Sequence, residues 1–268
     1  MFVRIAQRSD PRLAPFADVG QAVRLESEGL FVAEGRTVVR RLIVDATHPV
    51  AAVLVTPPAR AALDDVLTTL DAPVYVADQA VVNDITGFNF HRGCLALARR
   101  PTSTLSIDAL SPASRLLALE GIGNPDNVGG LFRTAFALGA DAMLLDATSG
   151  DPFYRKAIRT SMAATLRLPF ARVTDVHGAL ATLRSRGFRL LALTPSADAR
   201  SIDEVVRQPH ERLVLMLGAE GAGLSDEVLT LADIRVRIPV DPRADSLNVV
   251  VAAAIALHAL RRANERRE

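Results

Sequence analysis

Hydrophobic and polar positions alternate in short blocks along the first hundred residues, and this pattern predicts strands separated by helices. Short apolar runs are typical of buried strands, and apolar residues at helical spacing fill the intervals between them. The predicted strands are Leu30–Ala33, Val50–Val55, Val74–Ala77 and Cys94–Ala98, and the predicted helices are Arg36–Val44, Arg60–Leu70 and Asp78–Ile85. This order predicts a small αβα layered domain over residues 1–100.

A second, longer series of the same kind follows a polar, turn-rich stretch that predicts a linker over residues 101–112. The predicted strands are Arg115–Leu119, Ala142–Asp146, Arg189–Leu193, Arg212–Leu217 and Ile234–Val240, and a final helix is predicted from Leu247 to about Asn264. Strands that alternate with helices in this way favour a mainly parallel sheet that is covered on both faces. We therefore expect an α/β protein whose second domain spans residues 113–268.

Composition limits the classes of protein to which the chain can belong. Its 268 residues are 49% hydrophobic and 23% charged, enough for one large or two small globular domains. The sequence has no apolar run of the ~20 residues that a membrane-spanning helix needs, and its first residues do not have the pattern of a signal peptide. We therefore expect a cytoplasmic protein without a membrane partner. The single cysteine, Cys94, rules out an intramolecular disulfide and a thiolate zinc cluster, so we expect no metal.

The net charge of +1 neither supports nor excludes a nucleic-acid partner. A domain that binds nucleic acid without sequence preference usually has a pI above about 9, and this chain has a pI near 8.0. Nearly all basic residues are arginine, with Lys156 the sole lysine. Two local groups, Arg155/Lys156/Arg159 and Arg36/Arg40/Arg41, have the composition of phosphate-binding clusters, although solvated helix faces also carry such residues.

The segment Asn124–Ala135 has the signals of a helix start. Asn124 is a good N-cap with proline next to it, and Gly139 fits the position after the helix end. The helical spacing directs one apolar stripe to the core, comprising Val128, Leu131, Ala135 and Leu138. Asn127, Gly130 and Arg133 lie off that stripe. Arg133 is therefore either a surface charge or a group directed at a ligand.

A glycine-rich segment, Leu217–Ser225, follows a predicted strand. Its order of glycines is G-x-x-G-x-G, which differs from the dinucleotide fingerprint, and the sequence contains no P-loop. Glycine permits close approach of the backbone to a flat ligand such as an adenine edge. Glu220 is the one charged residue of the segment, and it is either functional or a helix-capping carboxylate before Leu224-Ser225.

A third segment, from Ile238 to Val249, leads into a helix that is apolar nearly all round and is therefore expected to be buried on several sides. Ser246 and Asn248 are its polar candidates. A purely structural interpretation makes Ser246 the N-cap of this helix and Asn248 a residue of its first turn.

Taken in order, the three segments resemble the signature motifs of the SpoU (TrmH) family of RNA ribose 2′-O-methyltransferases, in the SPOUT superfamily. The resemblance covers roughly residues 113 to 262. It implies a parallel-sheet methyltransferase domain with a C-terminal trefoil knot, S-adenosyl-L-methionine as cofactor and structured RNA as substrate. Ribosomal RNA is favoured as the substrate and transfer RNA comes next. It also implies a homodimer in which the last helix packs.

The N-terminal part resembles the smaller αβ, ribosomal-protein-like substrate-binding domain that many members of this family carry. The resemblance rests on Phe31–Val39 and Gly87–Ala96. A generic αβ domain, with Glu34 and His91 in turns, remains the alternative.

Carried over position by position, the resemblance implies that main-chain groups hold the cofactor at Leu217, Gly218, Ile238 and Leu247. It implies a reaction site formed by Asn127, Arg133, Glu220, Ser246 and Asn248. Two positions depart from the family pattern, because Ala219 stands where many relatives have a polar residue and Asn124 where aspartate is usual.

Two other classes of protein are alternatives to a methyltransferase. A non-catalytic RNA-binding or ribosome-assembly protein could retain the fold, but it has no need for all five reaction-site residues together. A nucleotide-dependent oxidoreductase lacks support, because the sequence contains neither the fingerprint nor a cluster of redox residues.

Overall fold

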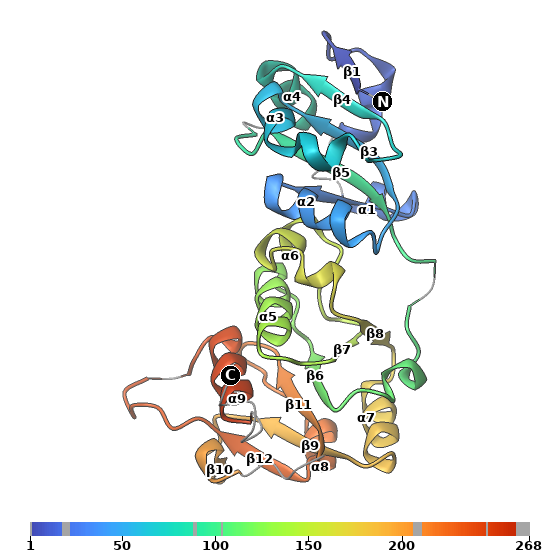
Figure 1. Cartoon of the computed structure of the whole chain (residues 1–268). Helices are drawn as coiled ribbons and strands as arrows, with labels where there is room; N and C mark the ends of the chain where they lie inside the picture. Colours follow the sequence, from blue (N-terminus) through green and yellow to red (C-terminus); the bar gives the residue numbers. More distant parts are fainter. Residues whose placement is uncertain are drawn as a thin grey trace. The chain divides into compact units, whose positions relative to one another are not determined.

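The structure, a computed structural model, describes residues 2–17, 22–87, 90–102, 104–205, 211–244 and 246–260 (Figure 1). The chain forms two compact units, of which the first comprises Met1–Ser103 and Pro152–Arg167 and the second Thr104–Asp151 and Leu168–Glu268. These units differ from the predicted domains at two points. Residues 152–167 join the first unit, and most of the predicted linker belongs to the second.

The first unit contains a five-stranded mixed sheet in the order β1-β4-β3-β5-β2. Strands β1, β4 and β3 are parallel, and β5 runs antiparallel to β3 and β2. The strands are β1 (Phe2–Ile5), β2 (Leu30–Glu34), β3 (Val50–Val55), β4 (Val74–Ala77) and β5 (Cys94–Arg99). The helices are α1 (Ala22–Ser27), α2 (Arg36–Asp45), α3 (Pro57–Leu67), α4 (Gln79–Thr86) and α6 (Arg155–Thr160), with short 3₁₀ turns at η1 (Pro11–Phe16) and η3 (Ala164–Leu166).

Most predicted elements of the first unit are confirmed, and β3 and β4 have the predicted bounds. Helix α3 begins three residues before the predicted Arg60, because Pro57 is well suited to the first turn of a helix. Strand β1 and helix α1 were not predicted. β1 is a strand of only four residues at the edge of the sheet, where it pairs with β4, and a charged residue, Arg4, interrupts its apolar run.

Ring contacts and a hydrogen bond hold residues 152–167 in the first unit. The Phe153 ring lies 5.2 Å from that of Phe31 and 5.4 Å from that of His48. The Thr47 hydroxyl donates to the Leu166 carbonyl at 3.2 Å. The segment is therefore continuous in sequence with the second unit but packs as part of the first.

The second unit contains a seven-stranded sheet in the order β10-β12-β9-β11-β6-β7-β8, in which every pair is parallel. The strands are β6 (Arg115–Glu120), β7 (Ala142–Asp146), β8 (Phe170–Val173), β9 (Phe188–Leu193), β10 (Arg200–Ser201), β11 (Arg212–Gly218) and β12 (Ile234–Arg237). The helices are α5 (Pro125–Ala137), α7 (Val176–Ser185), α8 (Asp226–Leu231) and α9 (Val249–Ala259), with 3₁₀ turns at η2 (Ile107–Leu110) and η4 (Ile202–Glu204).

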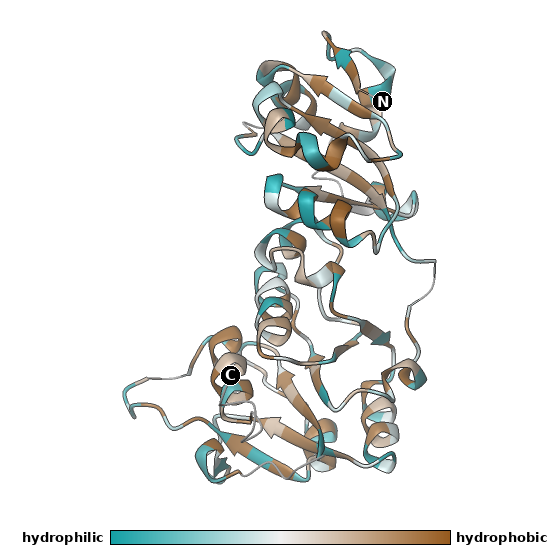
Figure 2. Cartoon of the chain, viewed as in Figure 1, coloured by the Kyte–Doolittle hydropathy of each residue, from teal (hydrophilic) through white to brown (hydrophobic). Residues whose placement is uncertain are grey.

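Both faces of the second sheet are covered, as the pattern predicted. Leu116 and Ala118 of β6 join a cluster with α7 and α8, and the intervening Leu117 and Leu119 are equally buried on the other face. Figure 2 shows the central strands β6, β9 and β11 as largely hydrophobic. Within the described parts of the chain, the helices are all too short or too polar to span a bilayer.

Three features of the second unit differ from the prediction by more than one residue. β12 ends at Arg237 rather than Val240, because Pro239 has no N–H to donate to a ladder. α9 begins at Val249 rather than Leu247, and its predicted end at Asn264 lies outside the described residues. η2 lies inside the predicted linker, where Leu110 is buried in the core. The trefoil knot remains a prediction.

A parallel sheet brings the carboxyl ends of its strands to one edge. The loops that follow β6, β11 and β12 contain or lead into the three motifs, and these loops therefore emerge at the same edge of the second sheet. In open parallel sheets this edge is where ligands bind.

Candidate functional site

Helix α5 carries the first motif and forms as the sequence predicts. The Asn124 side chain accepts a hydrogen bond from the Asp126 N–H at 2.9 Å, and Gly139 follows the helix with a φ of +74°. Val128, Leu131 and Ala135 are fully buried, whereas Leu138 is only half-buried. The core-facing stripe is thus confirmed except at its last position.

Gly130 brings the first and third motifs together. A Cβ at this position would lie 2.7 Å from the Cγ2 atom of Val250, closer than carbon atoms pack. Helices α5 and α9 are in contact, and glycine at 130 leaves the space that the Val250 side chain fills. Gly130, off the apolar stripe of α5, thus admits a side chain of α9.

Three polar side chains, one from each motif, form a single hydrogen-bonded network. The Asn127 amide donates to the Glu220 carboxylate, from Nδ2 to Oε1, at 2.9 Å. The Asn248 amide donates to Asn127 Oδ1 at 3.1 Å and to Glu220 Oε1 at 3.3 Å. Asn127 is buried, whereas Glu220 and Asn248 are exposed at the outer side of the network.

The position of Glu220 excludes the helix-capping interpretation. Ser225 caps helix α8 by accepting a hydrogen bond from the Val228 N–H. A different acid holds this cap, because Ser225 donates to Glu120 from its hydroxyl at 2.7 Å and from its N–H at 2.8 Å. Glu220 instead accepts from the amides of the other two motifs.

Asn248, not Ser246, is the N-cap of α9. Its Oδ1 accepts a hydrogen bond from the Val250 N–H at 2.9 Å, which corrects the interpretation that placed Ser246 at the cap and Asn248 in the first turn. The cap fixes the Asn248 side chain, so its Nδ2 is directed into the network. One residue therefore starts the helix and joins the site.

The glycine-rich loop after β11 folds back on itself. Ala219 and Gly223 exchange two backbone hydrogen bonds of 3.1 and 2.9 Å. A Cβ at Gly218 would overlap the backbone of Gly223 and Leu224. Gly221 and Gly223 have φ values of +89° and +73°, which favour glycine. The space left by Gly218 is thus occupied by the loop itself.

A pocket of about 660 Å³ opens beside this loop and the third motif. All four residues predicted to hold a cofactor line it, namely Leu217, Gly218, Ile238 and Leu247. Three of the five predicted reaction-site residues also line it, namely Glu220, Ser246 and Asn248. The remaining wall is partly apolar, with Leu193, Val240 and Ala252, and partly polar, with Thr194 and Arg237. The pocket has the size and mixed lining of a small-molecule site.

Arg133 lies apart from this arrangement within a single chain. It is exposed on α5, and its guanidinium makes no hydrogen bond or ion pair with any residue that the structure describes. It lies six positions after Asn127 in the same helix, a rise of about 9 Å. Asn127 reaches the pocket through Glu220 and Asn248, whereas Arg133 is not part of the pocket lining.

Asp146, at the end of β7, supports the site but was not predicted. Its Oδ1 accepts hydrogen bonds from the N–H groups of Gly121 at 3.2 Å and Ser149 at 2.9 Å, and its carboxylate also accepts from the Thr148 and Ser149 hydroxyls. Burial alone would raise the pKa of this carboxyl, but the hydrogen bonds from Ser149, Thr148 and Gly121 together lower it below its ordinary value. An acid at the carboxyl end of a strand is the sequence signal that marks this position.

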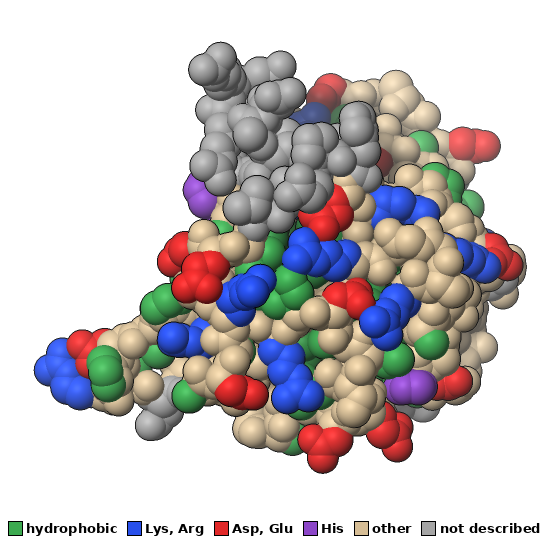
Figure 3. Space-filling model, turned by 90° about the horizontal axis from the view of Figure 1, so that it is seen from below, with side chains coloured by type: hydrophobic (Ala, Val, Ile, Leu, Met, Phe, Trp, Pro, Cys, Tyr) green, Lys and Arg blue, Asp and Glu red, His purple; other side chains and the backbone are tan. Residues whose placement is uncertain are grey.

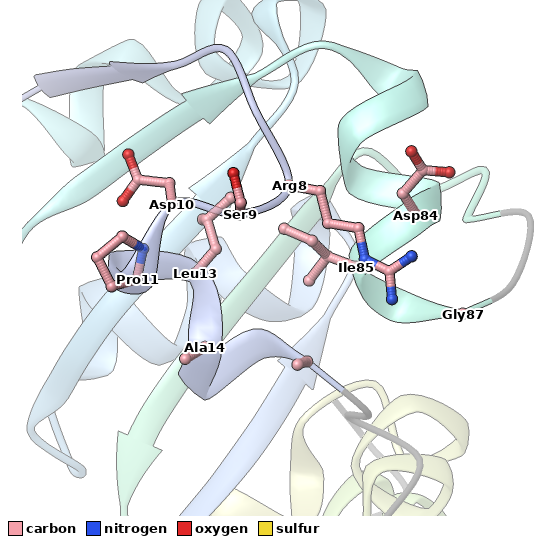
Figure 4. A pocket seen from close by; sticks show the side chains of 10 residues that line it. Arg8, Ser9, Asp10, Pro11, Leu13, Ala14, Asp84, Ile85 and Gly87 are labelled. Carbon is pink, nitrogen blue, oxygen red and sulfur yellow. The ribbon is translucent and has the colours of Figure 1, made fainter.

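A smaller hollow of about 210 Å³ lies in the first unit, between the start of η1 and the end of α4 (Figure 4). Arg8, Asp10 and Asp84 are its charged residues. The Asp10 carboxylate already accepts from the Arg12 guanidinium at 2.8 Å, and this side-chain hydrogen bond lowers its pKa to about 2. This hollow contains none of the motif residues, so the pocket of the second unit is the candidate site.

The described geometry defines an α/β protein with a ligand pocket at the carboxyl edge of a parallel sheet. A family model described as the SpoU rRNA Methylase family matches residues 114–258, more than half of the chain. The chain therefore belongs to the SpoU methylase family.

Similar proteins span nearly the whole chain. An uncharacterized tRNA/rRNA methyltransferase of Mycobacterium bovis is 38% identical over 259 residues, which cover 95% of this chain and 90% of the relative. The AdoMet-bound rRNA methyltransferase from Sinorhizobium meliloti has the same fold, with a TM-score of 0.82, 23% identity, and coverage of 96% of this chain and 97% of that one. A structure described as an RNA 2′-O ribose methyltransferase gives a TM-score of 0.79 at 29% identity, with coverage of 96% and 97%.

Proposed function

We propose that this protein transfers a methyl group from S-adenosyl-L-methionine to the ribose 2′-hydroxyl of a structured RNA. The observation that carries this proposal is the network of Asn127, Glu220 and Asn248, which joins all three motifs at one pocket. Membership of the SpoU family and similarity to a structure described as an RNA 2′-O ribose methyltransferase support it.

The pocket lining fits this cofactor. Apolar walls at Leu193, Val240 and Ala252 suit an adenine ring. Leu217, Ile238 and Leu247 also line the pocket, and we assign their main-chain groups to hold the edge of that ring. Glu220 adds a negative charge at the same pocket, which suits a cationic ligand. When bound, S-adenosyl-L-methionine supplies an activated methyl group on a sulfonium sulfur.

The residues of the chain then have to align the acceptor hydroxyl. Ser246 and Asn248 line the pocket and are exposed, so they are placed to orient a ribose. Glu220 is held in one position by two amides. Arginine keeps its proton, with a pKa of about 12.5–13.8, so we assign Arg133 to clamp the phosphate next to that ribose rather than to act as a base.

The chemistry determines the substrate class. Only RNA offers a 2′-hydroxyl, so the acceptor is RNA rather than DNA. Ribosomal RNA is the favoured acceptor and transfer RNA the second.

A homodimer would complete the site. Val251 and Ile255 of α9 are 47% and 38% exposed, and Phe136 of the adjoining α5 is 40% exposed. Exposed apolar side chains on two packed helices favour a second copy of this chain as their cover. Arg133 lies three residues from Phe136, and therefore next to it on the helix surface. We propose that Arg133 of one copy serves the pocket of the other.

The direct test is methyl transfer from labelled S-adenosyl-L-methionine to total RNA from a strain that lacks the enzyme. Transfer that is lost in Arg133→Ala, with cofactor affinity retained, supports the proposal. Cofactor binding without transfer to any RNA would instead favour the non-catalytic RNA-binding or assembly protein. Loss of cofactor binding together with turnover in Arg133→Ala would contradict the assigned roles.

Mixing two inactive variants tests the shared site. Arg133→Ala keeps its pocket, and Leu247→Trp narrows the pocket but keeps its arginine. If each site combines both copies, random exchange restores about a quarter of wild-type activity, because half the dimers are mixed and each has one intact site. Activity no greater than that of the separate variants would contradict a shared site.

A further inference from the structure

Glu120 ends strand β6, and its carboxylate binds both hydrogen-bond donors of Ser225. The Ser225 N–H donates to Oε2 at 2.8 Å, and the Ser225 hydroxyl donates to Oε1 at 2.7 Å. The two residues are 105 positions apart in the sequence. Both oxygens of the carboxylate therefore bind one residue, the last of the glycine-rich segment Leu217–Ser225.

An acidic side chain at the surface is not informative by itself. Acidic and basic side chains are interspersed on the face shown in Figure 3, and exposed ion pairs contribute little to stability. Glu120 is half-buried, and its partners are a backbone N–H and a hydroxyl group. Hydrogen bonds to a charged group are shorter and about twice as strong as those between neutral groups. The contact with Ser225 is therefore a strong attachment.

The backbone of Glu120 lies beside the start of the same segment. Gly218 is its partner in the parallel ladder between β11 and β6. The adjoining loops are also in contact, because a Cβ at Gly121 would lie 3.2 Å from that of Ala219. Near the far end of the segment, Leu224 packs in the core. The glycine-rich loop thus leaves the sheet beside the backbone of Glu120 and returns to the carboxylate of that residue.

Between these two ends the loop is exposed and rich in glycine. Gly221, Ala222 and Gly223 all face solvent, and glycine loses more conformational freedom than other residues when it is ordered. Two backbone hydrogen bonds between Ala219 and Gly223 close the turn. They join residues within the loop, so they do not attach it to the sheet. The order of the loop depends on how its ends are held.

The position of this loop determines two features of the candidate site. Glu220 belongs to the loop and accepts from the Asn127 amide at 2.9 Å. Asn127 lies on α5, the helix that follows β6 in the chain. Leu217, Gly218 and Glu220 also line the pocket. A loop that moved away from β6 would therefore separate Glu220 from Asn127 and change the shape of the pocket.

We infer that Glu120 is a positioning residue, whose carboxylate fixes the glycine-rich loop in the conformation that binds the cofactor. The inference rests on the proposed function for the identity of that cofactor. Without the carboxylate, the loop would populate other conformations. Cofactor affinity would then fall in proportion to the fraction of the protein that has the loop in place.

The test combines two measurements on the full-length protein. Hydrogen exchange without ligand reports the order of the loop, and calorimetric titration with S-adenosyl-L-methionine reports the affinity. Glu120→Gln keeps the size of the side chain but offers one acceptor oxygen to two donors. The loop amides, which include those of Ala219 and Gly223, should exchange faster than in the wild type. Cofactor affinity should fall about 3- to 10-fold.

The matched control is Asp141→Asn, because Asp141 makes the same pair of contacts at the opposite edge of this sheet. Its Oδ2 accepts from the Ser114 N–H at 2.8 Å and from the Ser114 hydroxyl at 3.0 Å. Ser114 directly precedes β6, so these contacts lie at the amino end of the strand. The control should have a lower melting temperature but wild-type loop exchange and wild-type cofactor affinity.

Glu120→Asp is the second variant, since it keeps the charge but shortens the side chain by one methylene. It should behave as Glu120→Gln does. Wild-type loop exchange in either folded variant would overturn the inference, and so would faster loop exchange with unchanged cofactor affinity. Equal effects in Asp141→Asn would also overturn it, because they would show a general loss of stability. A wild-type protein that does not bind the cofactor would contradict the proposed function, a result that is distinct from any change in loop exchange.

Discussion

Asn127 uses both ends of its amide in the site, donating to Glu220 and accepting from Asn248. The sequence predicted that all three residues belong to the site, but it could not predict these contacts. Glu220 lies 93 residues from Asn127 in the chain, and Asn248 lies 121 residues from it. Local spacing reports which face of a helix a residue occupies, whereas only the completed sheet brings these three side chains together.

Asn127→Asp should destabilise the protein increasingly as the pH rises. The new carboxylate would lie about 3 Å from Glu220, and like charges raise the pKa of such a pair. A raised folded-state pKa means that stability is retained at low pH and lost as the pH rises through that value. We expect a loss of roughly 1–3 kcal/mol at pH 8 and much less at pH 5.

Urea unfolding at both pH values measures this difference. Asn127→Ala is the matched control, because it removes the same hydrogen bonds without adding a charge. Its loss of stability should be similar at pH 5 and pH 8. A pH-independent loss in Asn127→Asp would show that the two carboxyl groups do not interact.

The lowered pKa of Asp146 predicts that its contribution to wild-type stability has the opposite pH dependence. Its lowered pKa means that its contribution is present at neutral pH and is lost as the pH falls below about 4. Asp146→Asn should therefore cost about 1–2 kcal/mol of unfolding free energy at pH 7, and the difference from wild type should shrink towards pH 3. Chemical denaturation at each pH measures the difference in unfolding free energy between Asp146→Asn and the wild type. A difference that does not change with pH would contradict an ionised, hydrogen-bonded Asp146 carboxylate.

At the scale of elements, apolar runs were the reliable signal. β3, β4 and β7 have the predicted bounds, because each is a short run of mostly apolar residues. β8 was not predicted, since its sequence Phe170-Ala-Arg-Val173 is short and interrupted by a charge. α9 begins at Val249 because Asn248 caps it, whereas the structural interpretation of the sequence placed Ser246 at the cap.

Gly130→Ala tests the packing of α5 on α9. Alanine favours a helix over glycine by about 1 kcal/mol, but its Cβ would lie 2.7 Å from the Val250 Cγ2 atom and Val250 is stiff. We expect a net loss of about 1–3 kcal/mol in the free energy of unfolding. Adding Val250→Ala should recover most of it in a double-mutant cycle, and additive losses would contradict direct contact.

Gly218→Ala tests the glycine-rich loop. The added Cβ would overlap the backbone of Gly223 and Leu224, which cannot rotate away as a side chain can. We expect Gly218→Ala to bind S-adenosyl-L-methionine more than about tenfold more weakly than the wild type, which is a loss of about 1.4 kcal/mol or more of binding free energy. Calorimetry measures this affinity. Gly123→Ala is the comparison for stability, because a Cβ there meets nothing within 4 Å. Unchanged cofactor affinity in Gly218→Ala would contradict a role for this loop in the pocket.

At the scale of the whole molecule, the sequence predicted two αβ parts but not their division. A linear domain boundary cannot describe residues 152–167, which leave the second unit after Asp151 and return to it at Leu168. The contacts of Phe153 with Phe31 and His48 hold this segment in the first unit. Each contact joins side chains that are more than one hundred residues apart in the sequence, so local patterns could not predict it. The dimer, the knot and the exchange of Arg133 between copies remain predictions that only the assembled protein can test.

The most direct measurement is nucleoside mass spectrometry of RNA after incubation with S-adenosyl-L-methionine and either the wild type or Arg133→Ala. The RNA is prepared from a strain that lacks the enzyme, so that its target nucleotide is unmodified. We predict one new 2′-O-methyl nucleoside with the wild type and none with the variant. A methyl group on a base, or no new methylated nucleoside with a protein that binds the cofactor, would contradict ribose methylation.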